Sequence, residues 1–215
     1  MAGVGAALAL LWLDVARAVE GLADLAWLAL ASLAGWVLAD LVSGVVHWWA
    51  DRIASERFPL LGSTFVRPFR EHHEDPLGIC RSDWVGTNGN TCIVVLPFVL
   101  LACFWQPWPA GGAGGLFASA AFVSLASWSV ATNQIHKWAH APRVPGPVRG
   151  LQRAGIFLSP GHHARHHTPP YARRYCITAG RFDALLDAIG LFPALEGLLG
   201  CPQPGPLARR RRSAS

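Results

Sequence analysis

Charged residues are scarce in this 215-residue chain, and several common motifs are missing. Asp, Glu, Lys and Arg make up 14% of the residues and hydrophobic residues 52%, which is unusual for a soluble domain. None of the five cysteines stands in a Cys-x-x-Cys motif, which excludes zinc-ribbon and thioredoxin-type sites and argues against a disulfide framework. The absence of P-loop, dinucleotide-binding and Gly-x-Ser-x-Gly motifs excludes further enzyme classes. The length fits one domain.

Basic residues outnumber acidic ones by 18 to 13, which raises the question of a nucleic-acid partner. The ten tryptophans and the long apolar runs favour a membrane instead, and the arginines do not follow one stripe. We therefore expect a lipid bilayer as a partner and no nucleic acid. No Lys or Arg precedes the first apolar run and no clean cleavage site follows it, so we expect no secretory signal peptide.

Three apolar runs predict membrane-spanning helices, because a span needs about 20 residues. A further apolar run at residues 3–13 is too short to cross alone and is followed by charged residues. Residues 1–24 are therefore interpreted as an interfacial or partial transmembrane segment. The three spans are expected at residues 25–46, 92–108 and 116–132.

The predicted architecture is an all-α integral membrane protein with three to four transmembrane helices. We place the main domain at residues 25–200 and a disordered basic tail at residues 201–215. The polar segment between the first two spans is expected to end in a turn at residues 87–90, where the sequence Thr-Asn-Gly-Asn is typical of turns. A near-helical spacing of apolar residues from 182 to 198 predicts an amphipathic helix, either on the membrane or packed in the domain, with Asp183 and Asp187 on its surface.

The basic residues predict which side of the membrane each loop faces. The loop between the second and third spans has no Lys or Arg, whereas residues 52–90 carry five and residues 134–181 carry eight. By the positive-inside rule both basic segments are cytoplasmic. All nine histidines lie in or next to these segments, so we expect them to meet at one face of the membrane. The Arg- and Ala-rich composition suggests a bacterial inner membrane.

All nine histidines fall into four clusters, although any single histidine is more often structural than a metal ligand. Spacings of three or four residues place imidazoles on one face of a helix, where they can bind one ion. A His-rich tract that only stores or senses metal is usually continuous, whereas these clusters lie apart and flank apolar segments. We predict a folded multinuclear metal site built from His47 with Asp51, His72 with His73, His136 with His140, and the group His162, His163, His166 and His167.

Eight or nine imidazoles and a carboxylate are more than one ion needs, so we expect two ions. Imidazole-rich sites suit iron, zinc or copper. Iron would activate O₂ against a C–H bond of a lipid, whereas zinc would support hydrolysis through an activated water. The spacing of the histidines leaves this choice open.

Asp40 is an ionisable residue inside the first predicted span, where a charge is costly. One interpretation is a functional carboxylate. The other is a carboxylate near the cytoplasmic end of the helix that hydrogen-bonds to a neighbour. The sequence leaves both interpretations open.

Five blocks of the sequence carry a resemblance to a known family. They are His-Trp-Trp-Ala-Asp from residue 47, Arg-Pro-Phe-Arg-Glu-His-His-Glu-Asp-Pro from residue 67, Asn-Gln-Ile-His-Lys-Trp-Ala-His from residue 133, His-His-Ala-Arg-His-His from residue 162 and Tyr-Cys-Ile-Thr from residue 175. The chain closely resembles the Kua/CarF family of plasmanylethanolamine desaturases, which is related to a plant plastid fatty-acid desaturase. That family usually continues its first block with Asp-Thr-Trp, whereas here Asp51 is followed by Arg52 and Ile53, so substrate fit at the membrane surface is expected to differ. The matching blocks follow in the same order, at residues 47–51, 67–76, 133–140, 162–167 and 175–178.

The resemblance implies an integral-membrane di-iron desaturase with a cytoplasmic His-rich di-metal cap. It would use O₂ to remove two hydrogens from the first two carbons of the sn-1 alkyl ether chain of an ether phospholipid, which gives a vinyl ether lipid, a plasmalogen. Electrons would come from a cytochrome b5 or ferredoxin-like donor. The implied metal set also includes His162, although the box at residues 163–167 is complete without it. The implied catalytic and metal-binding residues are His47, Asp51, His72, His73, His136, His140, His163, His166 and His167.

Other readings of the same residues stay open. An acyl-lipid desaturase that acts on a phospholipid acyl chain would need the same metal site, and an iron hydroxylase would share the first hydrogen abstraction. A membrane metal-binding protein without turnover is the alternative from another class. Four cations are expected either to contact the phosphate headgroup or to be solvated, namely Arg67, Arg70, Lys137 and Arg165.

Overall fold

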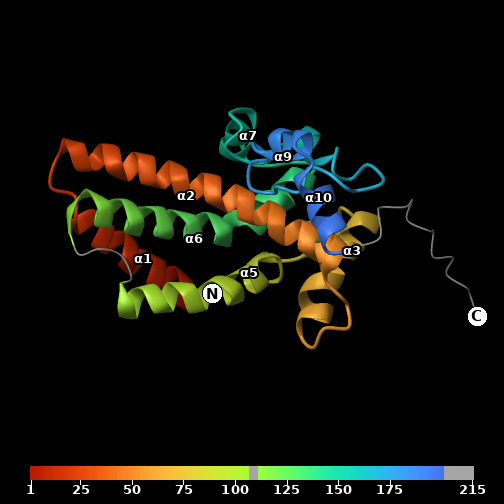
Figure 1. The fold of residues 1–215 in the computed structure, drawn as a ribbon, viewed down its shortest axis with the longest axis horizontal. Helices are drawn as coiled ribbons and strands as arrows, with labels where there is room; N and C mark the ends of the chain where they lie inside the picture. The colour runs from red at the N-terminus through yellow and green to blue at the C-terminus, as the bar shows by residue number, and fades with distance from the viewer. Residues whose placement is uncertain (107–110, 201–215) are drawn as a thin grey trace, which may run out of the picture.

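The computed structural model describes residues 1–106 and 111–200, and within them every regular element is helical, as predicted. The basic tail predicted to be disordered, residues 201–215, lies outside the described residues. Figure 1 shows the long helices along the long axis of the molecule and the short helices gathered at one end, which we call the cap. The long helices are α1 (Ala2–Arg17), α2 (Leu22–Trp48), α5 (Trp84–Trp105) and α6 (Gly112–His140).

Three of these helices are long and apolar enough to cross a membrane, which confirms the three predicted spans. They are α2 with its continuation to Ile53, α5 and α6. Their outer faces carry exposed apolar side chains, such as Leu30 of α2 and Phe98 of α5, which are 51% and 61% exposed. Surfaces of this kind suit contact with lipid chains. In the view of Figure 1, α6 lies between α2 and α5.

Small residues let α2 and α6 approach each other closely. A Cβ atom at Gly35 of α2 would come within 2.5 Å of the Cβ atom of Ser124 in α6. The Ser124 hydroxyl also donates a hydrogen bond of 2.8 Å to the carbonyl of Ser32. In a bilayer the hydrophobic effect does not drive helices together, so close packing of small residues has to hold them. This packing fixes the position of α6 against α2, and therefore of the two helix ends that enter the cap.

Helix α1 packs against the spanning helices. Its 16 residues are fewer than the roughly 20 that a span needs. Val4, Leu11 and Val15 are buried in the cluster that α1 forms with α5 and α6. Trp12 adds a hydrogen bond of 3.1 Å from its Nε1 to the hydroxyl of Ser127 in α6. This helix therefore lies along the apolar part of the bundle, away from the cap.

The turn predicted at residues 87–90 is wrong, because these residues form the first turns of α5. Asp83 precedes the helix, and its Oδ1 accepts a hydrogen bond of 2.7 Å from the backbone N–H of Gly86. Asn88 Nδ2 donates to the carbonyl of Trp84 at 2.9 Å. The polar side chains thus cap and line the start of a helix, and α5 extends further into the polar region than its apolar run suggests.

The cap consists of short helices joined by loops around the ends of α2 and α6. Helix α2 continues into a π-helix, η1, and a second π-helix, η2, leads into α3. Their bounds are η1 (Trp49–Ile53), η2 (Gly62–Val66), α3 (Arg67–Glu74), α4 (Gly78–Arg81), α7 (Gly146–Arg153), α8 (Pro160–His163), α9 (Asp183–Ala188) and α10 (Leu191–Leu198).

The single amphipathic helix predicted from residue 182 to 198 is two helices, α9 and α10. Gly190 separates them in a left-handed conformation with a φ of 63°, which glycine adopts without strain. Leu186 and Phe192 are buried against Trp48 of α2 and its neighbours. Asp183 was predicted on the surface and is fully buried, because it serves as a hydrogen-bond acceptor inside the cap.

Candidate metal centre

Nine of the ten predicted site residues converge in the cap, beside the ends of α2 and α6. They form two groups, and within each group the ligand atoms lie within 4.8 Å of one another. Each group draws residues from several of the sequence clusters. The five-histidine group contains His72, His136, His140, His163 and His167. The histidine–aspartate group contains His47, Asp51, His73 and His166.

The five-histidine group brings together the Nε2 atoms of imidazoles from three elements. His136 Nε2 in α6 lies 2.8 Å from His163 Nε2 and 3.3 Å from His140 Nε2. His167 Nε2 lies 3.1 Å from the Nε2 atoms of both His72 in α3 and His163. The predicted spacings of four residues therefore place both pairs, His136 with His140 and His163 with His167, in one group.

The histidine–aspartate group is arranged around one carboxylate oxygen. Asp51 Oδ2 lies 2.9 Å from His73 Nε2, 3.2 Å from His47 Nε2 and 3.5 Å from His166 Nε2. His47 lies in the last turn of α2, one residue before the helix ends at Trp48, and Asp51 lies in the π-helix η1 that follows. Widened turns of this kind are frequent at functional sites, because they redirect a side chain without ending the helix. His166 joins this group although its neighbour His167 joins the other.

The contacts fit metal ligation better than hydrogen bonding among histidines. Two neutral imidazoles can share one proton, but this cannot pair all the mutually close Nε2 atoms of five imidazoles. Nitrogen ligands that lie about 2.1 Å from an ion are about 3 Å apart when they are neighbours in an octahedral arrangement. The Nε2 separations of 2.8 to 3.3 Å agree with this distance. The residues present therefore fit a pair of imidazole-bound transition-metal ions.

Burial keeps four imidazoles of the cap neutral. Loss of solvation, aided by neighbouring imidazoles, holds the pKa of His72 and of His163 well below the usual range. The same causes lower the pKa of His166 to about 4 and that of His167 to about 2. A neutral imidazole offers the lone pair that a metal ligand needs.

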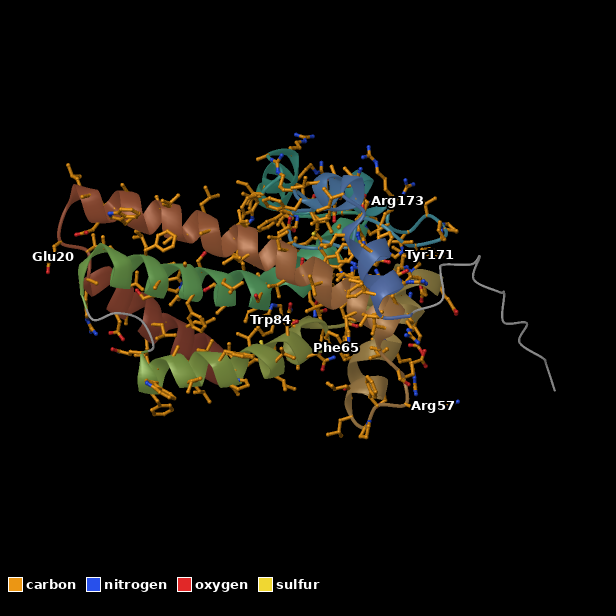
Figure 2. The ribbon with its side chains drawn as sticks, viewed as in Figure 1. Glu20, Arg57, Phe65, Trp84, Tyr171 and Arg173 are labelled. Atoms are coloured by element: carbon orange, nitrogen blue, oxygen red, sulfur yellow. The ribbon has the colours of Figure 1, made fainter. Side chains whose placement is uncertain are left out.

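Backbone carbonyls orient two imidazoles of the histidine–aspartate group. His47 Nδ1 donates to the carbonyl of Tyr175 at 3.0 Å, and His166 Nδ1 donates to the carbonyl of Arg173 at 2.8 Å. The lone pair then lies on Nε2, which in both residues has no hydrogen-bond partner within the described part of the chain. Figure 2 shows Arg173 in the cap, at the opposite end of the molecule from Glu20. Sequence reasoning missed these two contacts, because any residue can supply a carbonyl.

Asp40 holds the segment that follows Tyr175. Its carboxylate is fully buried and accepts backbone N–H groups of Ala179 at 2.7 Å, Gly180 at 3.0 Å and Arg181 at 3.0 Å. Of the two interpretations of this residue, the structure supports the hydrogen-bonded carboxylate. Asp40 thereby fixes the loop of the cap to α2, two helical turns before His47.

His162 lies outside both groups. Its Nε2 is 2.7 Å from Asp183 Oδ2, and the other oxygen of Asp183 accepts the backbone N–H of Cys176 at 3.0 Å. The pair therefore ties α8 to the loop that carries the Tyr175 carbonyl. The sequence pattern did not predict that Asp183 is the partner of His162, because it placed Asp183 on the surface.

Three of the four predicted headgroup-binding cations have partners in the protein, and two of these three bind backbone carbonyls. Arg70 donates through Nη2 to the carbonyl of Ala54 and so holds the end of η1. Lys137 Nζ donates to the carbonyl of Ser82, just before α5. Both cations therefore stabilise backbone turns around the site. Arg67 is exposed and its Nε lies 3.8 Å from Glu56 Oε2, and Arg165 is exposed.

Two cavities meet beside the site. The polar pocket, about 350 Å³, is lined by His72 and His136 of the five-histidine group and by the charged residues Glu71, Asp75 and Arg81. The apolar groove, about 330 Å³, lies between α2, α5 and α6 and is lined almost entirely by hydrocarbon. Both cavities are lined by the same three residues where they meet, Phe65, Phe69 and Asn133.

Three candidate membrane spans and a two-part cluster of eight histidines and one aspartate define a membrane protein with a histidine-rich candidate metal centre. Residues 36–202 match the lipid desaturase domain family, and the chain belongs to this family. The match confirms the resemblance that the sequence blocks carry.

Named relatives cover most of this chain. A plasmanylethanolamine desaturase of Myxococcus xanthus is 43% identical over 175 residues, which is 80% of this chain and 61% of the relative. Plasmanylethanolamine desaturase 1 of Mus musculus is 39% identical over 173 residues, 79% of this chain and 64% of the relative. The chloroplastic fatty acid desaturase 4 of Arabidopsis thaliana is 36% identical over 173 residues, 78% of this chain and 50% of the relative. The chain thus spans less than two thirds of these relatives, and no solved structure matches it significantly.

Proposed function

We propose that this chain is an O₂-dependent lipid desaturase that converts the sn-1 alkyl ether chain of an ether phospholipid into a vinyl ether. The observation that carries the proposal is the pair of ligand groups in the cap, within a chain of the lipid desaturase domain family. The names of two relatives, plasmanylethanolamine desaturases, favour the ether lipid as substrate.

Two iron ions are the proposed cofactor, one held by the five-histidine group and one by the histidine–aspartate group. Bound iron supplies the activation of O₂ for oxidation of a C–H bond. The reaction takes two hydrogens from neighbouring carbons of the chain. An external donor of the cytochrome b5 or ferredoxin type adds two electrons, and two protons come from solvent, so that O₂ leaves as two waters.

The side chains of the cap prepare this site before any substrate arrives. Backbone carbonyls hold the Nε2 atoms of His47 and His166 toward Asp51, and burial lowers the pKa of His166 and so keeps that imidazole unprotonated. Asp51 supplies a negative charge that balances part of the charge of a bound ion. We place the cap on the cytoplasmic side of a bacterial inner membrane, because every Lys and Arg other than Arg17 lies in the segments that follow the first span and precede the second, or that follow the third.

A second candidate function is an acyl-lipid desaturase, which the chloroplastic fatty acid desaturase 4 favours. The same ligand groups serve either chain. The two substrates differ in whether the desaturated chain is joined to glycerol by an ether or by an ester. Of the two products, only the vinyl ether is acid-labile.

The test is lipid mass spectrometry of cells that express the chain and are fed a labelled 1-O-alkyl phospholipid. We expect an acid-labile product that is lighter by two hydrogens, absent in His136→Ala and present in His162→Ala, a histidine outside both groups. A new double bond in an ester-linked chain alone would replace the proposal by the acyl-lipid desaturase. If neither lipid class changed, the chain would be a metal-binding membrane protein without catalytic turnover.

A further inference from the structure

The apolar groove has the form of a slot that opens toward the bilayer. Helix α6 packs against both α2 and α5 and forms its floor, while the other two helices form its walls. Val42 of α2 and Val94 of α5 face each other as wall residues and are 46% and 51% exposed. The groove therefore communicates with the lipid that surrounds the spanning helices.

Four of the five polar side chains in the lining, all except Ser129, have hydrogen-bond partners in the described part of the protein. The Ser43 hydroxyl donates to the carbonyl of Asp40 and accepts the N–H of Ile177. Thr132 donates to its own helix, and its hydroxyl lies 2.8 Å from that of Thr178. Because these groups already form hydrogen bonds within the protein, they need no polar partner from a bound ligand. The groove suits a hydrocarbon chain.

The cap end of the groove is where the environment changes from apolar to polar. Phe69 lines both cavities, and its ring centroid lies 5.2 Å from that of His47. On the polar side of Phe69, His72 and His136 form part of the pocket wall together with charged residues. Figure 2 shows Phe65, the second shared aromatic, beside the cap end of the bundle and close to Trp84 in this view.

We propose that the apolar groove holds the hydrocarbon chain of the phospholipid substrate, with the polar headgroup in the polar pocket. This assignment rests on the proposed function and adds to it the path of the chain and the identity of the walls. The change from apolar to polar surface occurs at Phe69, next to the ligand groups. The bond that reaches the metal centre is therefore at the headgroup end of the chain, and the remaining carbons extend along α6 away from the cap.

The same geometry gives the route of entry. On α6 the lining of the groove runs from Phe122 to Asn133, 11 positions apart, so the groove extends about 17 Å along this helix, at about 1.5 Å per residue. A chain can slide in sideways between α2 and α5 while it stays in the bilayer. The headgroup then stays at the membrane surface and does not have to pass through the apolar layer.

The test fills the groove from each wall and compares each filled variant with a neighbour on the same helix. In Val94→Trp the indole enters the groove, whereas in Ile93→Trp it faces lipid, because Ile93 is 70% exposed and does not line the groove. Val42→Trp and Leu38→Trp form the matched pair on α2. We expect a loss of at least tenfold in kcat/KM for both groove variants and less than twofold for both neighbours. The metal content per chain should be unchanged in all four, which shows that each variant is folded.

Binding is measured without turnover by photo-crosslinking. The purified protein in phosphatidylcholine vesicles is exposed to a 1-O-alkyl phospholipid with a diazirine in the middle of its chain. We expect labelled peptides from residues 91–98 and 122–129, and at least a tenfold drop in this labelling for Val94→Trp but not for Ile93→Trp. Labelling spread evenly over the lipid-facing surface, with equal activity in each matched pair, would overturn the assignment of the groove.

The two measurements separate the groove from the chemistry. If the groove is labelled and Val94→Trp removes the label, while no lipid gains a double bond, then the groove binds the hydrocarbon chain and the desaturase proposal is wrong. If the vinyl ether forms, while Val94→Trp and Val42→Trp change neither the labelling nor the activity, then the desaturase proposal is supported and the assignment of the groove is wrong.

Discussion

The two ligand groups of the cap differ in charge and in the way they are held. The five-histidine group offers only neutral nitrogen, whereas the histidine–aspartate group replaces two imidazoles by the carboxylate of Asp51. Carbonyls orient His47 and His166 in the second group. In the first, the Nδ1 atoms of His72, His163 and His167 are buried and have no partner in the described part of the protein. These imidazoles depend on the packing of α3, α6 and the chain around α8.

The difference teaches that the two groups are unequal partners and not two copies of one site. A carboxylate cancels part of the charge of a bound ion, so the two ions would differ in affinity and in redox potential. The two groups also depend on different structural supports. The histidine–aspartate group depends on a loop that Asp40 and Asp183 hold in place, whereas the five-histidine group depends on the end of a membrane helix. Each of the following changes should therefore affect one group more than the other.

The largest effect is expected for His136→Ala, which removes the imidazole that contacts both His140 and His163. Loss of a direct ligand costs more than the roughly 10- to 100-fold that loss of an outer partner costs in metal affinity. We expect no detectable vinyl ether and one ion per chain in place of two, measured by elemental mass spectrometry on the purified protein. Loss of both ions would show that the groups are not independent.

Asp51→Asn should give the next largest effect, and it acts on the other group. The amide keeps the size of the side chain but removes the charge that faces three imidazoles. We expect the affinity for one ion to fall by more than about 100-fold, with the ion of the five-histidine group retained. Metal titration of the apoprotein measures both affinities. Two unchanged affinities would mean that the carboxylate is not a ligand.

Asp40→Ala tests the support of the loop. The change leaves two buried N–H groups and one partly buried N–H group without an acceptor, which costs on the order of 3 kcal/mol of folding stability. Because the same loop supplies the Tyr175 carbonyl, we expect the affinity of the histidine–aspartate group to fall by roughly 10- to 100-fold. The control is Asp24→Ala, a half-buried acid at the far end of α2 that accepts the backbone N–H groups of Glu20 and Gly21, so it loses the same kind of bond far from the cap. Equal losses in both ligand groups would show general unfolding and not a local effect.

The sequence predicts which residues form the site better than it predicts how they divide between the two ligand groups. Periodicity places His136 and His140 together, and the distribution of basic residues brings all the histidine segments to one end of the bundle. The division of His163 and His167 from His166 could not be predicted, because it depends on the chain turning after α8 ends at His163. The spacing of histidines predicts which of them share a helix face only where the helix continues. Because α8 ends at His163, the histidines after it no longer follow the helical spacing.

The limits of the fold prediction have a similar cause. The three spans follow from their apolar runs, but the start of α5 does not, because Asp83 and Asn88 support polar helical turns that look like a loop. Asp40 shows the reverse case. A charge in a span indicates a special role, yet only the three-dimensional structure shows that its partners are backbone groups more than a hundred residues later.

The smallest effect is expected for His162→Ala, which decides whether this residue belongs with the other histidines. Its bond to Asp183 is replaced by water or by nothing, while Asp183 keeps the N–H of Cys176. We expect a loss of about 1 to 2 kcal/mol in folding stability, two bound ions and a retained product. His162→Gln should recover part of the stability, because its amide can still donate to the carboxylate. If His162→Ala instead bound a single ion, all four histidines of the box would be ligands, and the separation of the two groups would have to be redrawn around His162.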